Sequence, residues 1–183
     1  AYNPAMPESS KVLVWDLPVR AFHWTLVVLF AVSWWSGETG GTALKYHFWS
    51  GYAVLTLVLF RLAWGIVGSE HARFSSFIYS PLTILAFLWD TAMMRAKRYI
   101  GHNPAGGAMV AALILSVGAI AATGYMMTTD AFWGVGWVED AHKSLVWFTI
   151  GLVVLHIAGV ILASIEHKEN LVRSMFTGRK RAE

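Results

Sequence analysis

Residues 142–156, HKSLVWFTIGLVVLH, form an apolar run with a histidine at each end. A run this apolar is typical of a membrane-spanning helix, and such a helix does not need two titratable rings along its length. A rise of about 1.5 Å per residue places His156 roughly 21 Å beyond His142 along the helix axis. Steps of about 100° leave the two rings only about 40° apart around that axis, so both face the same direction.

The composition of the whole chain is that of a membrane protein. The 183 residues are 56% hydrophobic and 14% charged, and the mean hydropathy is +0.52. The absence of cysteine excludes a disulfide framework, a thiolate zinc site, a cysteine-ligated iron–sulfur cluster and covalently attached c-type haem. The formal net charge of +3 is explained by arginines and lysines beside the membrane, so we expect no nucleic-acid partner.

Four apolar segments are long enough to cross a bilayer. They span about residues 18–36, 43–67, 106–127 and 141–165. A polar or irregular lead precedes the first and a polar tail follows the fourth. We therefore expect one membrane-embedded domain over residues 1–183, folded as an all-α bundle of four transmembrane helices.

A further apolar stretch, residues 81–94, lies between the second and third spans. It is short for a crossing and contains Asp90, so we predict a helix that lies at the membrane interface. A fifth crossing there would also spoil the alternation of charge between successive connections.

Basic residues are concentrated in alternate connections. Those before the first span, between the second and third, and after the fourth are Lys11, Arg20, Arg73, Arg95, Lys97, Arg98, Lys168, Arg173, Arg179, Lys180 and Arg181. The other two connections carry little beyond Lys45 and Lys143, and the last one contains Asp130, Glu139 and Asp140. The positive-inside rule therefore predicts that both termini face the cytoplasm.

Four of the seven histidines lie in or at the edge of the expected spans, and this topology sorts them into two layers. His23 and His156 fall near the cytoplasmic face, whereas His47 and His142 fall near the outer face. Each layer draws its two histidines from different helices. Two imidazoles facing each other across a bundle are the axial ligand set of a b-type haem, so we expect two haem b groups with these histidines on the iron.

Two other interpretations of the histidines stay open. A single membrane histidine can simply form a hydrogen bond to a neighbouring helix. A layer could also hold zinc or another transition metal, although such sites usually need three or four ligands and no carboxylate lies within a span at either layer. Glu139 and Asp140, next to His142, keep a peripheral metal site open.

Several basic side chains near the two layers are candidate partners for haem propionates. Arg61 lies 14 residues after His47 and thus in the inner layer, where a buried arginine needs an anion or a route to the headgroups. A propionate could accept two hydrogen bonds from its guanidinium group, and snorkelling to the interface is the alternative. Arg20, Lys45 and Lys143 are candidates for the same role, with interfacial anchoring as their alternative.

Five stretches of the chain carry a resemblance to a known family. They are VWDLPVRAFHW (14–24), KYHFWSGY (45–52), RLAWGIVG (61–68), GHNPAGG (101–107) and DAHKSLVWFTIGLVVLH (140–156). Together they resemble the bacterial cytochrome b561 family, which includes b-type subunits of nickel–iron hydrogenases. The resemblance implies a four-helix bundle with two b haems in the bacterial inner membrane, and it supports the same four histidines as ligands.

The resemblance also implies a quinone site beside the cytoplasmic haem. In distantly similar formate dehydrogenase b subunits, quinone binds near the start of a helix that carries an Asn–Gly motif, and GHNPAGG resembles that motif. This makes Asn103 and His102 candidates for the quinone site, with Asp16 as a candidate proton acceptor. The alternative for Asn103 is a plain turn and helix start.

The main expectation is therefore a dihaem cytochrome that exchanges electrons between the quinone pool and a periplasmic c-type cytochrome or hydrogenase-like redox partner. A second hypothesis is a stand-alone superoxide oxidase, which takes electrons from superoxide at the outer face and passes them to ubiquinone. That anionic substrate favours an electropositive outer face, whereas the acidic outer connections favour a basic protein partner. A third hypothesis is a non-redox helical membrane protein that binds metal.

Overall fold

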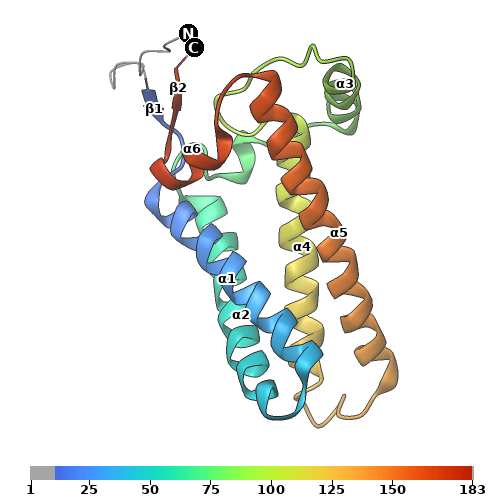
Figure 1. Cartoon of the computed structure of the whole chain (residues 1–183). Coiled ribbons are helices and arrows are strands. Elements are labelled where there is room, and N and C mark those ends of the chain that lie inside the picture. The colour runs from blue at the N-terminus through green and yellow to red at the C-terminus, as the bar shows by residue number, and fades with distance from the viewer. Residues whose placement is uncertain (1–10, 183) are drawn as a thin grey trace.

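The computed structural model describes residues 11–182, and four long helices dominate it (Figure 1). They are α1 (Leu17–Thr39), α2 (Leu44–Val67), α4 (Pro104–Met126) and α5 (Gly136–Glu166). All four are long and apolar enough to cross a membrane. The expected architecture of four transmembrane helices is thus confirmed.

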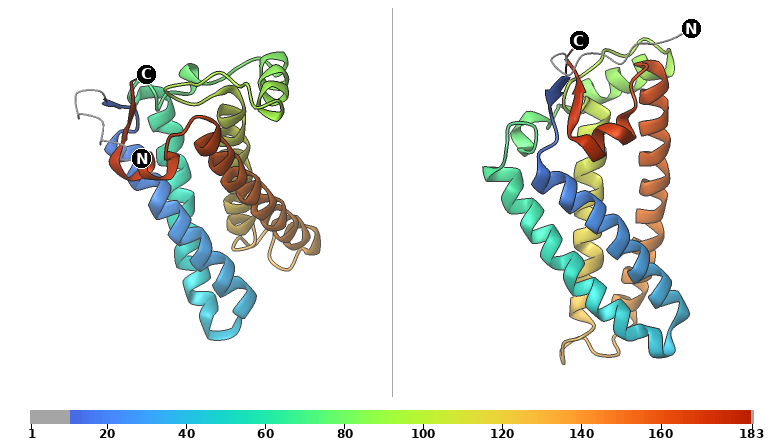
Figure 2. Two further views of the ribbon diagram at one scale, coloured as in Figure 1. Left: turned by 45° about the horizontal axis from the view of Figure 1, so that its top comes forward. Right: turned by 60° about the vertical axis from the view of Figure 1, so that its left-hand side comes forward.

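The four helices pack as two pairs. Helix α1 lies along α2 and α4 lies along α5, and the two pairs meet mainly where α2 contacts α4 (Figure 2). The buried centre of that contact is formed by Val54 and Val58 of α2 and Val117 of α4, with Leu26 and Leu29 of α1 packed against it. Helices α1 and α5 are not among the closely packed pairs of the described chain, so histidines on these two helices face each other across a more open part of the bundle.

Local sequence signals explain where the helices begin. The side chains of Asp16 and Asn103 each accept a hydrogen bond from a first-turn backbone N–H, and a proline occupies the first turn of both helices. Short polar side chains at the N-cap and proline at the first helical positions are the expected start of a helix. Helix α5 begins five residues before the predicted position 141, because Val138 is fully buried and Glu139 favours the positive N-terminal end of the helix dipole.

The short helix predicted between the second and third spans is present as α3 (Pro81–Ala92). Ser80 caps it, and its Phe87 is the only residue of the helix that is buried. Leu82, Leu85 and Trp89 are exposed. A helix with this much exposed apolar surface, packed mainly on α4, fits the predicted position at the membrane interface.

The polar lead and tail of the sequence contain structure that was not predicted. Strand β1 (Lys11–Leu13) pairs antiparallel with β2 (Arg179–Arg181), and α6 (Leu171–Thr177) precedes β2. Between α6 and β2, Gly178 has φ +78°, and its carbonyl accepts hydrogen bonds from the backbone N–H groups of Val14 and Trp15. Two three-residue strands from opposite ends of the chain leave no periodic signal in the sequence, so only the tertiary structure reveals the pair.

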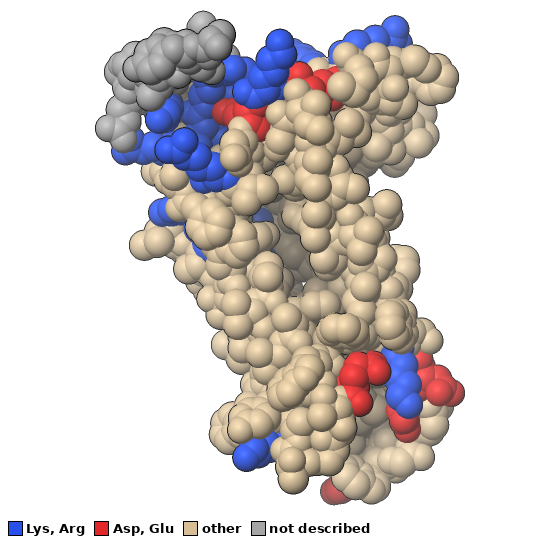
Figure 3. Space-filling model, viewed as in Figure 1, with Lys and Arg blue, Asp and Glu red and all other residues tan. Residues whose placement is uncertain are grey.

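The two ends of the bundle differ in charge. The end that carries α3, α6, β1 and β2 gathers most of the visible lysine and arginine side chains, whereas the opposite end shows mainly acidic groups (Figure 3). The two short 3-10 helices, η2 (Gly41–Ala43) and η3 (Phe74–Ser76), belong to the connections at the acidic and the basic end respectively.

Candidate functional site

His47 of α2 and His142 of α5 form a close pair near the acidic end. Their ring centres are 6.1 Å apart and their planes are inclined by 74°. A metal–imidazole bond is about 2 Å long, so two such bonds plus the radii of the two rings come to roughly 6 Å. The pair therefore has the spacing of two axial ligands that share one metal ion.

The Nδ1 atoms of both rings are held by hydrogen bonds to groups on neighbouring helices. His47 Nδ1 lies 2.8 Å from the carbonyl oxygen of Ser33. His142 Nδ1 lies 3.0 Å from Thr123 Oγ1 and 3.1 Å from the carbonyl oxygen of Ile120. A carbonyl can only accept, so these contacts place the proton on Nδ1 and leave Nε2 with a free lone pair, as metal-binding histidines require. Neither Ser33 nor Thr123 was identified from the sequence, where each was simply a polar residue in an apolar run.

Glycines on neighbouring helices make room for the two rings. A Cβ atom on Gly37 would lie 2.9 Å from His47 Nδ1, and one on Gly124 would lie 3.2 Å from His142 Cε1. A real side chain cannot approach so closely without moving the ring. These positions on α1 and α4 therefore fix how deeply the histidines sit in the bundle.

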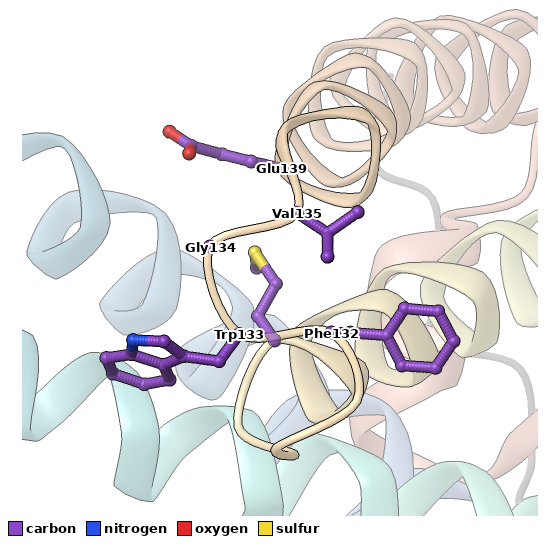
Figure 4. A pocket seen from close by; sticks show the side chains of 6 residues that line it. Phe132, Trp133, Gly134, Val135 and Glu139 are labelled. Carbon is purple, nitrogen blue, oxygen red and sulfur yellow. The ribbon is translucent and has the colours of Figure 1, made fainter.

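A cavity of about 410 Å³ surrounds this histidine pair. Its walls are mostly apolar, and Glu38, Glu139 and Lys143 line it. A smaller cavity of about 250 Å³ adjoins it in the α4–α5 connection, where Trp133 and Phe132 point to opposite sides (Figure 4). An apolar cavity that converges on two imidazoles is suited to a planar macrocycle with a central metal.

His23 of α1 and His156 of α5 form the second pair, on the side of the bundle nearer the basic end. The two rings are close enough to interact electrostatically. The Nδ1 atom of His23 is buried without a hydrogen-bond partner among the described residues, and the ring stands edge-on to Trp24 at 4.9 Å. The structure thus brings His47 and His142 together and places His23 within electrostatic range of His156.

The four basic candidates for propionate partners lie in different surroundings. Lys143 forms an exposed ion pair with Glu139 at 2.6 Å, and Lys45 lies over the Tyr46 ring. Arg20 donates from Nη1 to the carbonyl of Phe176, while its Nε is buried without a partner in the described chain. Nη1 of Arg61 is likewise buried without a partner among the described residues. The two arginines, and not the two lysines, therefore have buried nitrogens that could bind a further group.

Asp16 and Asn103, two of the candidates for the quinone site, are engaged in structural hydrogen bonds. Asp16 accepts from the Val19 N–H at 2.8 Å, from Trp64 Nε1 at 3.0 Å and from Ser69 Oγ at 2.6 Å. Burial raises the pKa of Asp16, but these hydrogen bonds outweigh it and the net pKa is lowered. Asn103 Oδ1 accepts from the Gly106 N–H at 2.7 Å, which is the helix-start alternative that the sequence left open.

His102, the third candidate, is a partly buried residue whose Nδ1 atom is buried and whose ring lies between two aromatic side chains. Its ring centre lies 4.6 Å from that of Trp15 and 4.5 Å from that of Phe77. Burial, together with the nearby charges of Arg61 and Lys180, lowers the pKa of His102 to about 3. The imidazole is therefore neutral at physiological pH.

Comparison with known proteins gives one family and several relatives. The family described as prokaryotic cytochrome b561 matches residues 14–178. Proteins named probable Ni/Fe-hydrogenase B-type cytochrome subunit are similar to this chain. That of Bradyrhizobium diazoefficiens is 25% identical over 92% of this chain and 85% of its own. That of Azotobacter vinelandii is 25% identical over 93% and 89%, and that of Cupriavidus necator is 26% identical over 90% and 85%. No solved structure matches the chain.

Proposed function

The chain belongs to the prokaryotic cytochrome b561 family, and from this premise we propose that it binds two haem b groups and carries electrons across the membrane between a quinone and a redox protein. It is a multi-pass membrane b-type cytochrome, distantly related to hydrogenase cytochrome subunits. The haem, when bound, supplies the one-electron chemistry. The helices supply ligands, orientation and a water-poor environment.

The observation that carries this proposal is the geometry of His47 and His142. Their spacing suits one shared iron, and hydrogen bonds at Nδ1 leave Nε2 of each ring free to bind it when haem is present. We assign His23 and His156 to the second haem on the same pattern of one ligand from each of two helices. Both pairs draw a ligand from α5, and the separation of roughly 21 Å between His142 and His156 along that helix sets the path between the two sites.

The donor set argues against the alternative of a zinc-type site. Among residues 11–182, no group of three or more His, Asp or Glu side chains is placed to hold a metal ion. Two histidines alone are too few for a structural or catalytic zinc site but complete the axial set of a haem.

We propose that the basic end faces the cytoplasm and that a bacterial inner membrane surrounds the four spans. The gathering of lysine and arginine at that end supports this orientation. The redox partner, a c-type cytochrome or a hydrogenase-like protein, would then dock at the acidic periplasmic end, above His47 and His142. The relatives are named probable Ni/Fe-hydrogenase B-type cytochrome subunits, and a subunit of a larger enzyme supports a protein partner for this chain.

Haem content tests the proposal directly. We expect a purified preparation to show a b-type reduced spectrum and about two haems per chain in a pyridine haemochrome assay. His156→Ala should remove one of the two, because one axial ligand is lost, whereas His167→Gln, outside the spans, should retain both. A chain that binds no haem, or a His156→Ala variant that retains two, contradicts the assignment.

A further inference from the structure

Two side chains at the basic end, one buried and one partly buried, are among those of the described residues that have a buried hydrogen-bonding atom without a partner. The two atoms are Nη1 of Arg61, a residue only 3% exposed, and Nδ1 of His102. Buried polar atoms are nearly always paired, because leaving one unsatisfied costs its full desolvation energy. Two such atoms in one region indicate that something else binds there.

Arg61 is fixed in place by the η3 connection. Its Nη2 donates to the carbonyl of Ala72 at 3.0 Å, and its guanidinium group lies 4.9 Å from the centre of the Phe74 ring. These contacts hold one side of the planar group and leave Nη1 free. An arginine held this rigidly is prepared to donate to a ligand with little loss of conformational entropy.

His102 is also held in place, its side chain by two rings and its backbone by a hydrogen bond. Trp15 and Phe77 flank the imidazole, and Tyr79 Oη donates to its backbone carbonyl at 3.3 Å. A neutral imidazole can donate or accept at Nδ1, depending on its tautomer. The ring therefore offers one adaptable contact at a fixed position.

The two residues are connected by a pair of aromatic rings: Arg61 lies over Phe74, the ring centres of Phe74 and Phe77 are 5.8 Å apart, and Phe77 flanks His102. His102 is within electrostatic range of both Arg61 and His156. Asp16 is the acidic group near Arg61, but its oxygens accept hydrogen bonds from Val19, Trp64 and Ser69. Asp16 thus offsets the charge of Arg61 without satisfying Nη1.

We propose that Arg61 and His102 together bind a carbonyl-type oxygen of a ligand seated beside His156, and that this ligand is the quinone. This inference rests on the proposed function, which supplies both candidate oxygens: a quinone carbonyl and a carboxylate of the inner haem. Because Asp16 already neutralises Arg61, a second carboxylate would be repelled, whereas a neutral carbonyl would not. We therefore expect Arg61 and His102 to contact the ligand. Asn103 and Asp16 do not contact it, because their side-chain oxygens cap helices α4 and α1.

The test measures quinol binding and haem properties in the same variants. Full-length protein in detergent is reduced with decylubiquinol as the probe, and KM is obtained from the rate of haem reduction. Arg61→Gln and His102→Phe should each raise KM about tenfold, with two haems retained and both midpoint potentials unchanged. Arg61→Lys should recover part of the loss, because it restores a donor without the planar geometry. Arg95→Gln is the matched control, since Arg95 is an exposed arginine at the same end, paired with Asp90.

Each other outcome overturns the inference in a distinguishable way. An unchanged KM in both variants with two haems bound removes these residues from the quinone site. An unchanged KM with a shifted potential of one haem places Arg61 on a haem carboxylate instead. Should Arg61→Gln fail to retain haem, His102→Phe decides alone, because phenylalanine can fill the space between Trp15 and Phe77. Failure of the proposed function looks different, since unaltered protein would then not be reduced by the quinol at all.

Discussion

For individual residues, the positions of the His47 and His142 rings depend on two glycines, Gly37 and Gly124. Adding a methyl group at Gly37 or Gly124 would place a carbon 2.9 or 3.2 Å from the ring of His47 or His142. We expect Gly37→Ala and Gly124→Ala to displace the rings and to lower haem occupancy from two toward one per chain. Gly151→Ala is the control, because nothing lies within 4 Å of the added carbon there. A Gly37→Ala protein with two haems and an unchanged spectrum would show that the ring is free to move.

The depressed pKa of His102 predicts that stability depends on pH. In the folded protein the ring takes up a proton only near pH 3, whereas in the unfolded chain it does so near pH 6.5. Below pH 6.5 the unfolded state therefore binds more protons, and the folded state loses up to about 1.4 kcal/mol of stability per pH unit from this group.

The comparison of two pH values isolates this effect. Between pH 7 and pH 5 the unaltered protein should lose about 2 kcal/mol more than His102→Phe, which cannot titrate. Thermal unfolding followed by tryptophan fluorescence at both pH values measures the difference. Equal losses in the two proteins would mean that His102 is protonated or solvated in the folded state.

At the scale of the element, the C-terminal segment binds the basic end of the bundle together. Phe176 of α6 stacks on Trp24 of α1 at 4.2 Å. Arg98, in the connection before α4, forms a largely buried ion pair with Glu169 at 3.0 Å, and Lys180 of β2 donates to the carbonyl of Tyr99 at 3.0 Å. These contacts close the bundle over the region of the inner histidine pair.

The buried ion pair of this segment provides a stability prediction. Glu169→Gln leaves the Arg98 guanidinium without its counter-charge, so the folded state should lose about 2 kcal/mol or more. Asp90→Asn breaks a pair that is mostly exposed and should change stability by less than about 1 kcal/mol. The melting temperatures of the two variants, measured side by side, test this. Equal values would show that the Arg98–Glu169 pair is solvated.

At the scale of the whole molecule, the separation of charge between the two ends predicts the kind of redox partner. The acidic end exposes Glu38, Asp130 and Asp140 against Lys45, while Glu139 and Lys143 neutralise each other. A basic redox protein would be attracted to this end, and salt would screen the attraction. Superoxide, an anion, would be repelled.

Electron transfer to a soluble probe measures that attraction. With a basic c-type cytochrome as acceptor, the rate from the reduced protein should fall severalfold as ionic strength rises from about 0.01 to 0.15 M, where the Debye length shortens from about 30 to 8 Å. The Asp130→Asn/Asp140→Asn double variant should be slower at low salt and less sensitive to it. A rate that does not depend on salt, or rapid haem reduction by superoxide without any partner, would contradict this docking surface.

The sequence by itself determined the four spans, the short helix between the second and third, and the two histidines on one face of α5. These features depend on the length of an apolar run and on the helical period, which are properties of contiguous residues. It also pointed to the family, through motifs spread over most of the chain.

Only the tertiary structure decided which atoms are free to bind. Ser33, Ile120 and Thr123 orient the outer rings, and Trp64 and Ser69 donate hydrogen bonds to the carboxylate of Asp16. The strand pair and the aromatic rings that connect Arg61 to His102 likewise join segments distant in the chain. Each of these outcomes depends on hydrogen bonds and packing between such segments, and no local pattern in the sequence specifies which donor will meet which acceptor.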